Sequence, residues 1–255
     1  MTEPQDIVFF SMGICSAYIT CRLQDECRKP IPLFSDTKRE DVDTYRFGHE
    51  VADRWGFEIA DASNGMDLWE WFAKQKMIPA RQLSPCSLAF KIIPSRAWLH
   101  ENFESKGIPA VVHIGYDRNE QHRADKVMEH WEYKHISVKF DLIEWQVDKA
   151  QCFGYFAQHN VKPPRVYQHF QHANCMPCKN FREADWIAYA YHFPEGFAEA
   201  ATFEVTHGLR WMQDGPKLID LALSDKVPSR KGRRKLAGAE PAFSFDMGCD
   251  RCAMD

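Results

Sequence analysis

The stretch from Asp6 to Ser16, DIVFFSMGICS, decides the fold, because an apolar run leads directly into a turn of small residues. DIVFF is short and rich in β-forming residues, whereas SAYITCRLQDEC, from Ser16 to Cys27, has a helical pattern. We therefore predict a strand that passes through a tight turn into a helix. Such a turn leaves backbone N–H groups unpaired at the positive end of the helix dipole, an arrangement that suits an anion.

The turn has the spacing Ser-x-Gly-x-x-Ser, which is typical of a phosphate cradle. Gly13 allows close approach of a ligand, and the hydroxyls of Ser11 and Ser16 can donate to phosphate oxygens. Backbone N–H groups supply the other contacts, so we expect the whole turn to bind phosphate: Ser11, Met12, Gly13, Ile14, Cys15 and Ser16. The alternative is an ordinary strand-to-helix turn with a capping serine.

Strand-like and helix-like segments alternate through the first half of the chain. The patterns predict strands at 31–36, 57–62 and 108–116 and helices at 41–56, 66–76 and 87–107, the last one interrupted at Pro94. This alternation predicts an α/β fold, an open and mostly parallel sheet with helices on both faces. Ligands of such sheets bind beyond the carboxyl ends of the strands, where Ser11, Asp36 and Gly115 fall.

The chain divides into two predicted regions. Residues 1–150 form the α/β domain, and residues 151–255 form a helical region rich in aromatic residues, proline and histidine. Residues 185–211 have the pattern of packed helix, whereas the end of the chain shows little periodicity.

Composition limits the classes of protein to consider. The chain has 255 residues, 45% of them hydrophobic, and no apolar run approaches the ~20 residues of a membrane helix. We expect a soluble, cytoplasmic protein, since the N-terminus has no secretory pattern. The nine cysteines are then expected to be reduced thiols or metal ligands.

One segment departs from the net charge of −4: SRKGRRK, at 229–235, has five cations in seven residues. It is either a solvated loop or a contact for phosphate, on a nucleotide or on a nucleic-acid backbone.

Two C-x-x-C pairs, Cys175 with Cys178 and Cys249 with Cys252, predict a metal site. The two-residue spacer lets both thiolates converge on one ion or cluster, and zinc bound by all four would fasten the end of the chain to the helical region.

Five stretches resemble, in the same order, motifs of the phosphoadenylyl sulfate (PAPS) reductases, a family of the PP-loop superfamily of adenine-nucleotide alpha hydrolases. FFSMGICS resembles the SGGKDS loop, and LFSDTKREDVDTYRFGHEVADRWG resembles a strand, Asp-Thr, and a helix with Glu-Thr-Tyr. CSLAFKIIPSRAWL is similar to Cys-x-x-x-Lys-x-x-Pro-Leu, and HIGYDRNEQHRA to Gly-x-x-x-x-Glu-x-x-x-Arg. Residues 140–178 follow the Pro-Leu-x-x-Trp, Pro-x-x-x-Tyr and Gly-Cys-x-x-Cys sequence, and the similarity spans roughly 6–200.

The resemblance implies roles for residues beyond the cradle. Asp36 and Thr37 would lie near the nucleoside, Gly115 would let backbone approach the ligand, and Arg123 would face its anionic part. Ile14 and Cys15 replace the family's Lys and Asp, a cation for phosphate and a carboxylate that could help hold magnesium. Cleavage of ATP should therefore suffer more than nucleotide binding.

The resemblance also extends to the cysteines. NCMPC is similar to the cluster-binding Gly-Cys-x-Pro-Cys of adenylyl sulfate reductases, whose other ligands form a Cys-Cys pair where this chain has Cys86 and Ser87. This implies a 4Fe-4S cluster on Cys86, Cys175, Cys178 and Cys249, with Cys252 left as a catalytic thiol that could carry sulfur. Structural zinc is the alternative.

Three functional hypotheses follow. The first is an enzyme that binds ATP or PAPS and transfers or reduces sulfur, with a thiol reductant or sulfur donor as partner. The second is a nucleotide-binding module whose loop has lost its chemistry and whose end is held by zinc. The third is an enzyme that adds sulfur to nucleic acid, bound through the basic run at 229–235.

Overall fold

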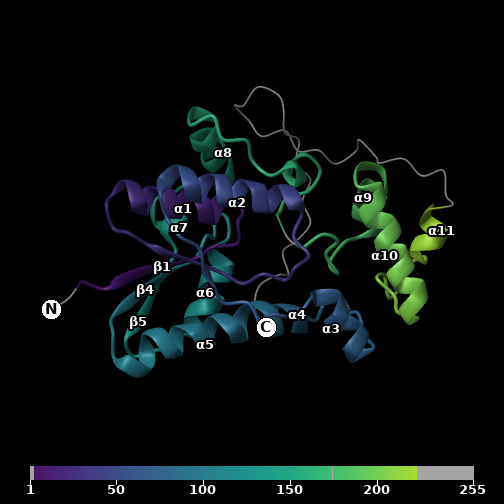
Figure 1. Cartoon of the computed structure of the whole chain (residues 1–255), viewed down its shortest axis with the longest axis horizontal. Helices are drawn as coiled ribbons and strands as arrows, with labels where there is room; N and C mark the ends of the chain where they lie inside the picture. The colour runs from purple at the N-terminus through teal and green to yellow at the C-terminus, as the bar shows by residue number, and fades with distance from the viewer. Residues whose placement is uncertain (1–2, 174, 223–255) are drawn as a thin grey trace.

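The fold is built on one sheet of five parallel strands in the order β3-β2-β1-β4-β5. It comes from a computed structural model, which describes residues 3–173 and 175–222. The strands are β1 (Gln5–Phe9), β2 (Ile31–Phe34), β3 (Ala60–Asp61), β4 (Ala110–His113) and β5 (Ile136–Lys139). Helices cover both faces of the sheet (Figure 1), so the predicted α/β fold class is confirmed.

Helices connect the strands and make up most of the rest of the described chain. They are α1 (Ile14–Asp25), α2 (Val42–Trp55), α3 (Leu68–Gln75), α4 (Pro85–Ser87), α5 (Ile93–Asn102), α6 (Gln121–Glu129), α7 (Asp141–Glu144), α8 (Lys149–Gln158), α9 (Glu183–His192), α10 (Pro194–His207) and α11 (Leu218–Ala222). A π-helical turn occupies Leu88–Ile92, and short 3-10 turns occupy Glu104–Lys106 and Arg165–Gln168. None of the helices in the described ranges is long and apolar enough to cross a membrane.

Alternating side chains of the strands build a separate core on each face of the sheet. Val8 and Phe10 pack on the face covered by α1, α2 and α8, whereas Ile7 and Leu33 pack on the face covered by α5 and α6. Figure 1 shows α1 and α2 on one side of the strands and α5 on the other. With both faces buried, β2 (IPLF) and the first three residues of β4 (AVV) are continuous apolar runs.

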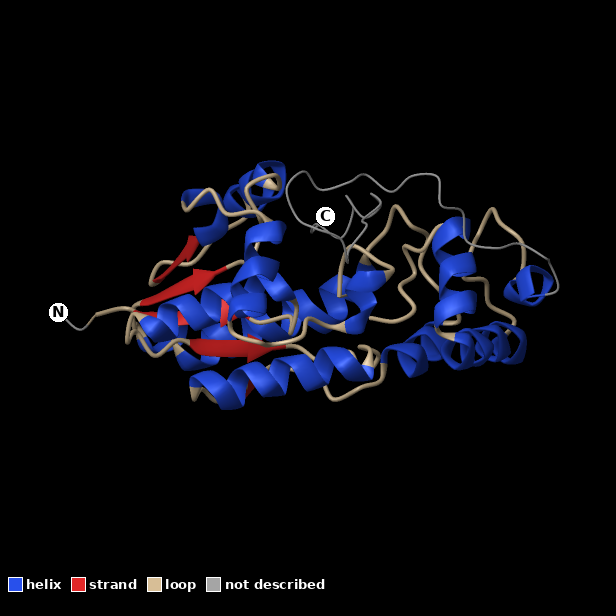
Figure 2. Cartoon of the chain, turned by 90° about the horizontal axis from the view of Figure 1, so that it is seen from above, coloured by secondary structure: helices blue, strands red, loops and turns tan. Residues whose placement is uncertain are grey.

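A third apolar cluster lies beyond the carboxyl ends of the strands and holds α9, α10 and α11, which we call the helical lobe. Trp186 and Trp211 are buried in it, and α3 contributes Trp69 and Phe72. Figure 2 shows the strand arrows pointing toward this lobe. The carboxyl ends of the strands therefore face the lobe.

Several boundaries differ from the sequence-based expectations. The helix predicted at 185–211 breaks between α9 and α10, because Pro194 lacks the N–H that would continue α9. The interruption expected at Pro94 lies earlier, where the π-helical turn leads into α5. The basic run at 229–235 and Cys249 and Cys252 lie outside the described residues.

Candidate functional site

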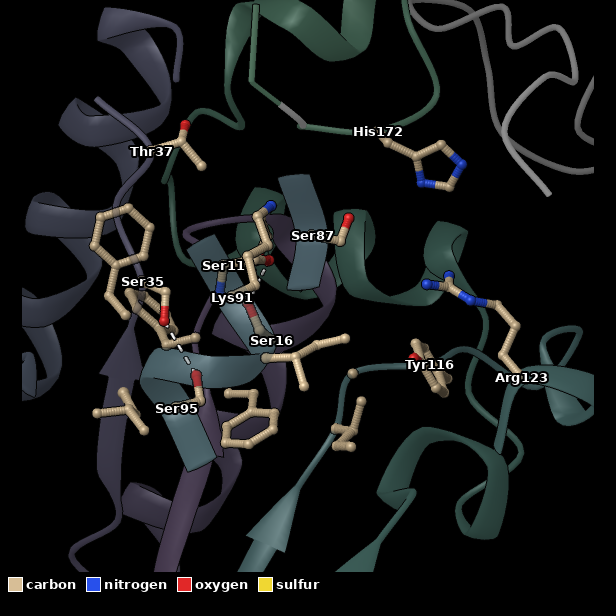
Figure 3. Close-up of a pocket in the computed structure, with 18 of the residues that line it drawn as sticks. Ser11, Ser16, Ser35, Thr37, Ser87, Lys91, Ser95, Tyr116, Arg123 and His172 are labelled. Carbon is tan, nitrogen blue, oxygen red and sulfur yellow. Dashed lines mark hydrogen bonds between the residues drawn. The ribbon is translucent and has the colours of Figure 1, made fainter. Parts of the chain in front are cut away.

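A cavity of about 630 Å³ opens at the carboxyl ends of β1, β2 and β4. Its wall includes Ser11, Gly13, Cys15 and Ser16 from the predicted cradle, together with Thr37, Gly115 and Arg123. Figure 3 shows Ser11, Ser16, Ser35, Thr37, Tyr116 and Arg123 around this space. Three separate segments that the sequence placed at strand ends thus meet at one cavity, as a parallel sheet requires.

Hydrogen bonds within the cradle fix both serines. The Ser11 N–H donates to Ser16 Oγ over 3.1 Å, and Ser16 Oγ donates to the Gly13 carbonyl over 3.1 Å. The two hydroxyl oxygens, Ser11 Oγ and Ser16 Oγ, lie 3.2 Å apart. The cradle is therefore ordered by its own contacts before any ligand arrives.

Two of the six cradle residues do not face the cavity. Met12 and Ile14 are buried at 2% and 0% exposure and pack in the apolar cluster beneath the turn. The Ile14 N–H donates to the Tyr167 hydroxyl over 3.0 Å, so this donor is already used. That leaves a smaller anion site than the sequence implied.

Position 115 requires a glycine, because its backbone packs closely against another backbone segment. A Cβ at this position would lie 3.0 Å from the Ser16 backbone nitrogen and 3.3 Å from the Cys15 carbonyl carbon. The glycine therefore lets the segment after β4 lie against the first turn of α1. That Gly115 also lets the backbone approach a ligand stays a prediction.

The segment after β2 brings one of its two expected residues, Thr37, to the cavity. Asp36 is engaged elsewhere: its Oδ1 accepts from the Tyr45 hydroxyl at 2.6 Å and from the Lys38 N–H at 2.7 Å. Asp36 is not among the residues that line the cavity, whereas Thr37 and Glu40 are. The sequence offered no signal for Glu40, because DTKRED has the composition of an exposed charged turn.

Lys91 supplies a cation to the same wall, from the π-helical turn between α4 and α5. Ser35 directly follows β2, and Ser95 lies on α5. A hydrogen bond of 3.1 Å between their Oγ atoms joins the end of β2 to α5 (Figure 3). Lys91 stands in the stretch CSLAFKIIPSRAWL, whose resemblance to Lys-x-x-Pro was the sequence signal for it. It replaces part of the positive charge missing from the cradle.

Arg123 lies on α6 at the other side of the cavity. Its guanidinium stacks over the Tyr116 ring, 4.1 Å from the centroid, and pairs with Glu120. Burial alone would raise the pKa of Glu120, but the charge of Arg123 and a backbone hydrogen bond from Asp117 lower it. The arginine is thus held in place by a charged carboxylate.

Four cysteines, Cys15, Cys86, Cys175 and Cys178, also line the cavity. Three of them belong to the predicted cluster ligands, and Cys178 is 5% exposed. Within residues 3–173 and 175–222, however, no three His, Cys, Asp or Glu side chains form a group that could hold a metal ion.

Comparison with solved structures finds a likeness to the crystal structure of phosphoadenylyl-sulfate (PAPS) reductase from Candida auris, solved as a phosphate complex. The identity is 16% and the TM-score 0.46, over 65% of this chain and 77% of that chain. The sequence matches no protein-family model and none of the curated proteins. The residues that line the cavity must therefore carry a functional proposal.

Proposed function

We propose that this protein binds an adenine nucleotide, ATP or PAPS, in the cavity at the strand ends, and that it is an enzyme of sulfur or sulfonucleotide transfer or reduction. One observation supports this more than any other: the serine cradle, the cations Lys91 and Arg123 among five lysine and arginine side chains, and the cysteines all line the same cavity. Phosphate oxygens would lie at the cradle, within reach of Lys91 and Arg123. The thiols would lie where a sulfur-bearing group could meet them.

The positive charge of the site fits an anionic ligand despite the missing cradle lysine. Lys91 comes from the π-helical turn and Arg123 from α6, and both line the cavity. Charge-assisted hydrogen bonds to phosphate are about twice as strong as neutral ones, so two such side chains offset the loss of one.

A second candidate is a nucleotide-binding module without chemistry. It is favoured by the cradle itself, where Ile14 is buried and its N–H is bound to Tyr167, while Cys15 offers no carboxylate for magnesium. Pyrophosphate release or sulfite production by the purified protein would rule it out.

The 4Fe-4S cluster remains part of the proposal, with Cys86, Cys175, Cys178 and Cys249 as ligands. Because the described cysteines do not form a metal group by themselves, Cys249 would have to complete the site. The visible spectrum of anaerobically purified full-length protein tests this, since thiolate-bound iron absorbs visible light and zinc does not. A colourless protein that contains zinc would contradict the iron-sulfur cluster and support structural zinc instead.

The nucleotide proposal is tested by isothermal titration calorimetry of the full chain with ATP and with PAPS. We expect saturable binding at one site, weakened at least about tenfold in the double variant S11A/S16A, because the variant loses the Ser11 hydroxyl and the hydrogen bonds of Ser16 that order the cradle. Ser137→Ala is the matched control, since Ser137 is exposed on β5. Absence of heat with both nucleotides would contradict the proposal.

A further inference from the structure

We propose that Glu40 accepts a hydrogen bond from a ribose hydroxyl of the bound nucleotide, and that its carboxylate disfavours a ribose that carries a second phosphate. The inference rests on the proposed function and deepens it, because it separates ATP from PAPS. It concerns a residue that the motifs do not include.

Glu40 has an unusual environment for a carboxylate. It is 9% exposed and lines the cavity. The Thr37 hydroxyl donates to its Oε1 over 3.2 Å, whereas Oε2 is buried and has no hydrogen-bond partner among the described residues. An unsatisfied buried acceptor is destabilising, and more so when it is charged, so such groups in a binding cavity are candidates to meet a ligand donor.

The position of Glu40 relative to the cradle indicates which part of a nucleotide it would meet. β1 and β2 are paired neighbours, with Phe9 opposite Leu33, so the cradle after β1 lies beside the segment after β2. Glu40 itself lies six residues beyond Phe34, the last residue of β2, and lines the same cavity as the cradle. With phosphate at the cradle, the group next to it is the ribose, and the base lies further on.

The charges around Glu40 favour a hydroxyl and oppose a phosphate. Burial raises the pKa of Glu40, while Lys91 and the Thr37 hydroxyl favour its charged form and Asp36 opposes it. The charge of Lys91 and that of Asp36 thus act on Glu40 in opposite directions. A phosphate placed here would add a further negative charge in a poorly solvated space.

The same logic operates in other parallel sheets. In dinucleotide-binding folds, an acidic residue at the end of the second strand hydrogen-bonds a ribose hydroxyl and disfavours its phosphorylated form. Repulsion of the wrong ligand is an effective source of specificity. Glu40 would combine both features in the segment between β2 and α2.

The test compares ligands that differ at the ribose alone. For the wild-type chain, calorimetry should show adenosine 5′-phosphosulfate binding at least about tenfold more tightly than PAPS, which differs by a ribose phosphate. Either 2′-deoxy-ATP or 3′-deoxy-ATP should bind about tenfold more weakly than ATP. In Glu40→Gln both ratios should shrink toward one, while Glu70→Gln, an exposed site on α3, should keep the wild-type ratios.

The outcomes separate the two proposals. No binding of any adenine nucleotide to the wild type would contradict the proposed function and this inference with it. Nucleotide binding with unchanged ratios in E40Q would overturn the inference alone. If E40Q does not fold, the wild-type series decides, because equal affinities for all ribose forms would overturn the role of Glu40.

Discussion

Gly13 and Tyr167 illustrate how single atoms shape the cradle. A Cβ at Gly13 would lie 2.9 Å from the Tyr167 hydroxyl oxygen and 3.2 Å from Ser11 Oγ. The backbone of Gly13, at φ −94° and ψ 165°, is open to any residue, so space rather than dihedral freedom requires glycine. The tyrosine hydroxyl thus limits the space beside the cradle turn.

This contact predicts non-additive effects of two substitutions. Gly13→Ala should lower the free energy of unfolding by about 1–3 kcal/mol, because the new methyl group overlaps the hydroxyl. In a Tyr167→Phe background, Gly13→Ala should lower the free energy of unfolding by about 1 kcal/mol less, because the overlap with the tyrosine hydroxyl is gone. Denaturant unfolding of the wild type, the two single variants and the double variant measures the coupling energy between positions 13 and 167. Strictly additive free energies would show that Tyr167 does not limit the turn.

Lys179 is a second residue whose role follows from its contacts. It is 4% exposed, and its Nζ donates to the carbonyls of Ala80 at 3.0 Å, Arg81 at 3.2 Å and Leu83. Lys179→Met should lower the free energy of unfolding by about 2 kcal/mol, because charge-assisted bonds are lost. Urea unfolding checks this, with Lys74→Met on the exposed side of α3 as control. Equal midpoints for both variants would count against the role of Lys179.

At the scale of elements, a buried histidine joins β1, β4 and α7. His113 is fully buried; its Nε2 lies 3.0 Å from Asp6 Oδ1, and its Nδ1 lies 2.6 Å from Asp141 Oδ2. Both ring nitrogens can donate only when the imidazole is protonated. Burial alone would lower the pKa of His113, but the hydrogen bonds and charges of Asp141 and Asp6 raise it above 6.5.

The raised pKa predicts a direction of pH dependence. The protonated form is stabilised in the folded state, so its contribution is full below pH 6.5, the ordinary value, and is lost as pH rises through the folded-state pKa. The stability advantage of the wild type over His113→Gln should therefore be largest near pH 6 and decrease toward alkaline pH. Urea unfolding across this range measures it, with His122→Gln, exposed on α6, as control. A difference that does not vary with pH would contradict the assignment.

The elements that the sequence predicted best are those with strong local signals. The helix predicted at 41–56 ends as expected, because Gly56 adopts the left-handed conformation, φ 68°, that glycine favours. β5 went unpredicted: it has four residues with mixed burial, and its pairing with β4 supplies what its own pattern lacks. Glu40 was missed for a related reason, since only tertiary contacts bury a residue within so charged a segment.

At the scale of the whole molecule, the cavity is walled from two directions. The cradle, Thr37 and Gly115 come from the strand ends, whereas His172, Cys175, Cys178 and Lys179 come from the segment that leads into the helical lobe. Arg39 adds a link, because its guanidinium pairs with Asp67 at the start of α3 and with Glu199 on α10. A ligand in the cavity would therefore contact both walls together.

This arrangement predicts how a bound nucleotide changes the dynamics of the chain. Saturating ATP should slow amide hydrogen exchange in two segments far apart in sequence, 11–16 and 175–180, because local opening of either wall would break contacts with the ligand. At a ligand concentration of 100 times Kd, binding should also add about 2.7 kcal/mol to the free energy of unfolding. The S11A/S16A variant at the same ATP concentration is the control and should lose both effects. Protection confined to 11–16 would show that the ligand touches the strand ends alone, and the cysteines would then have no place in its chemistry.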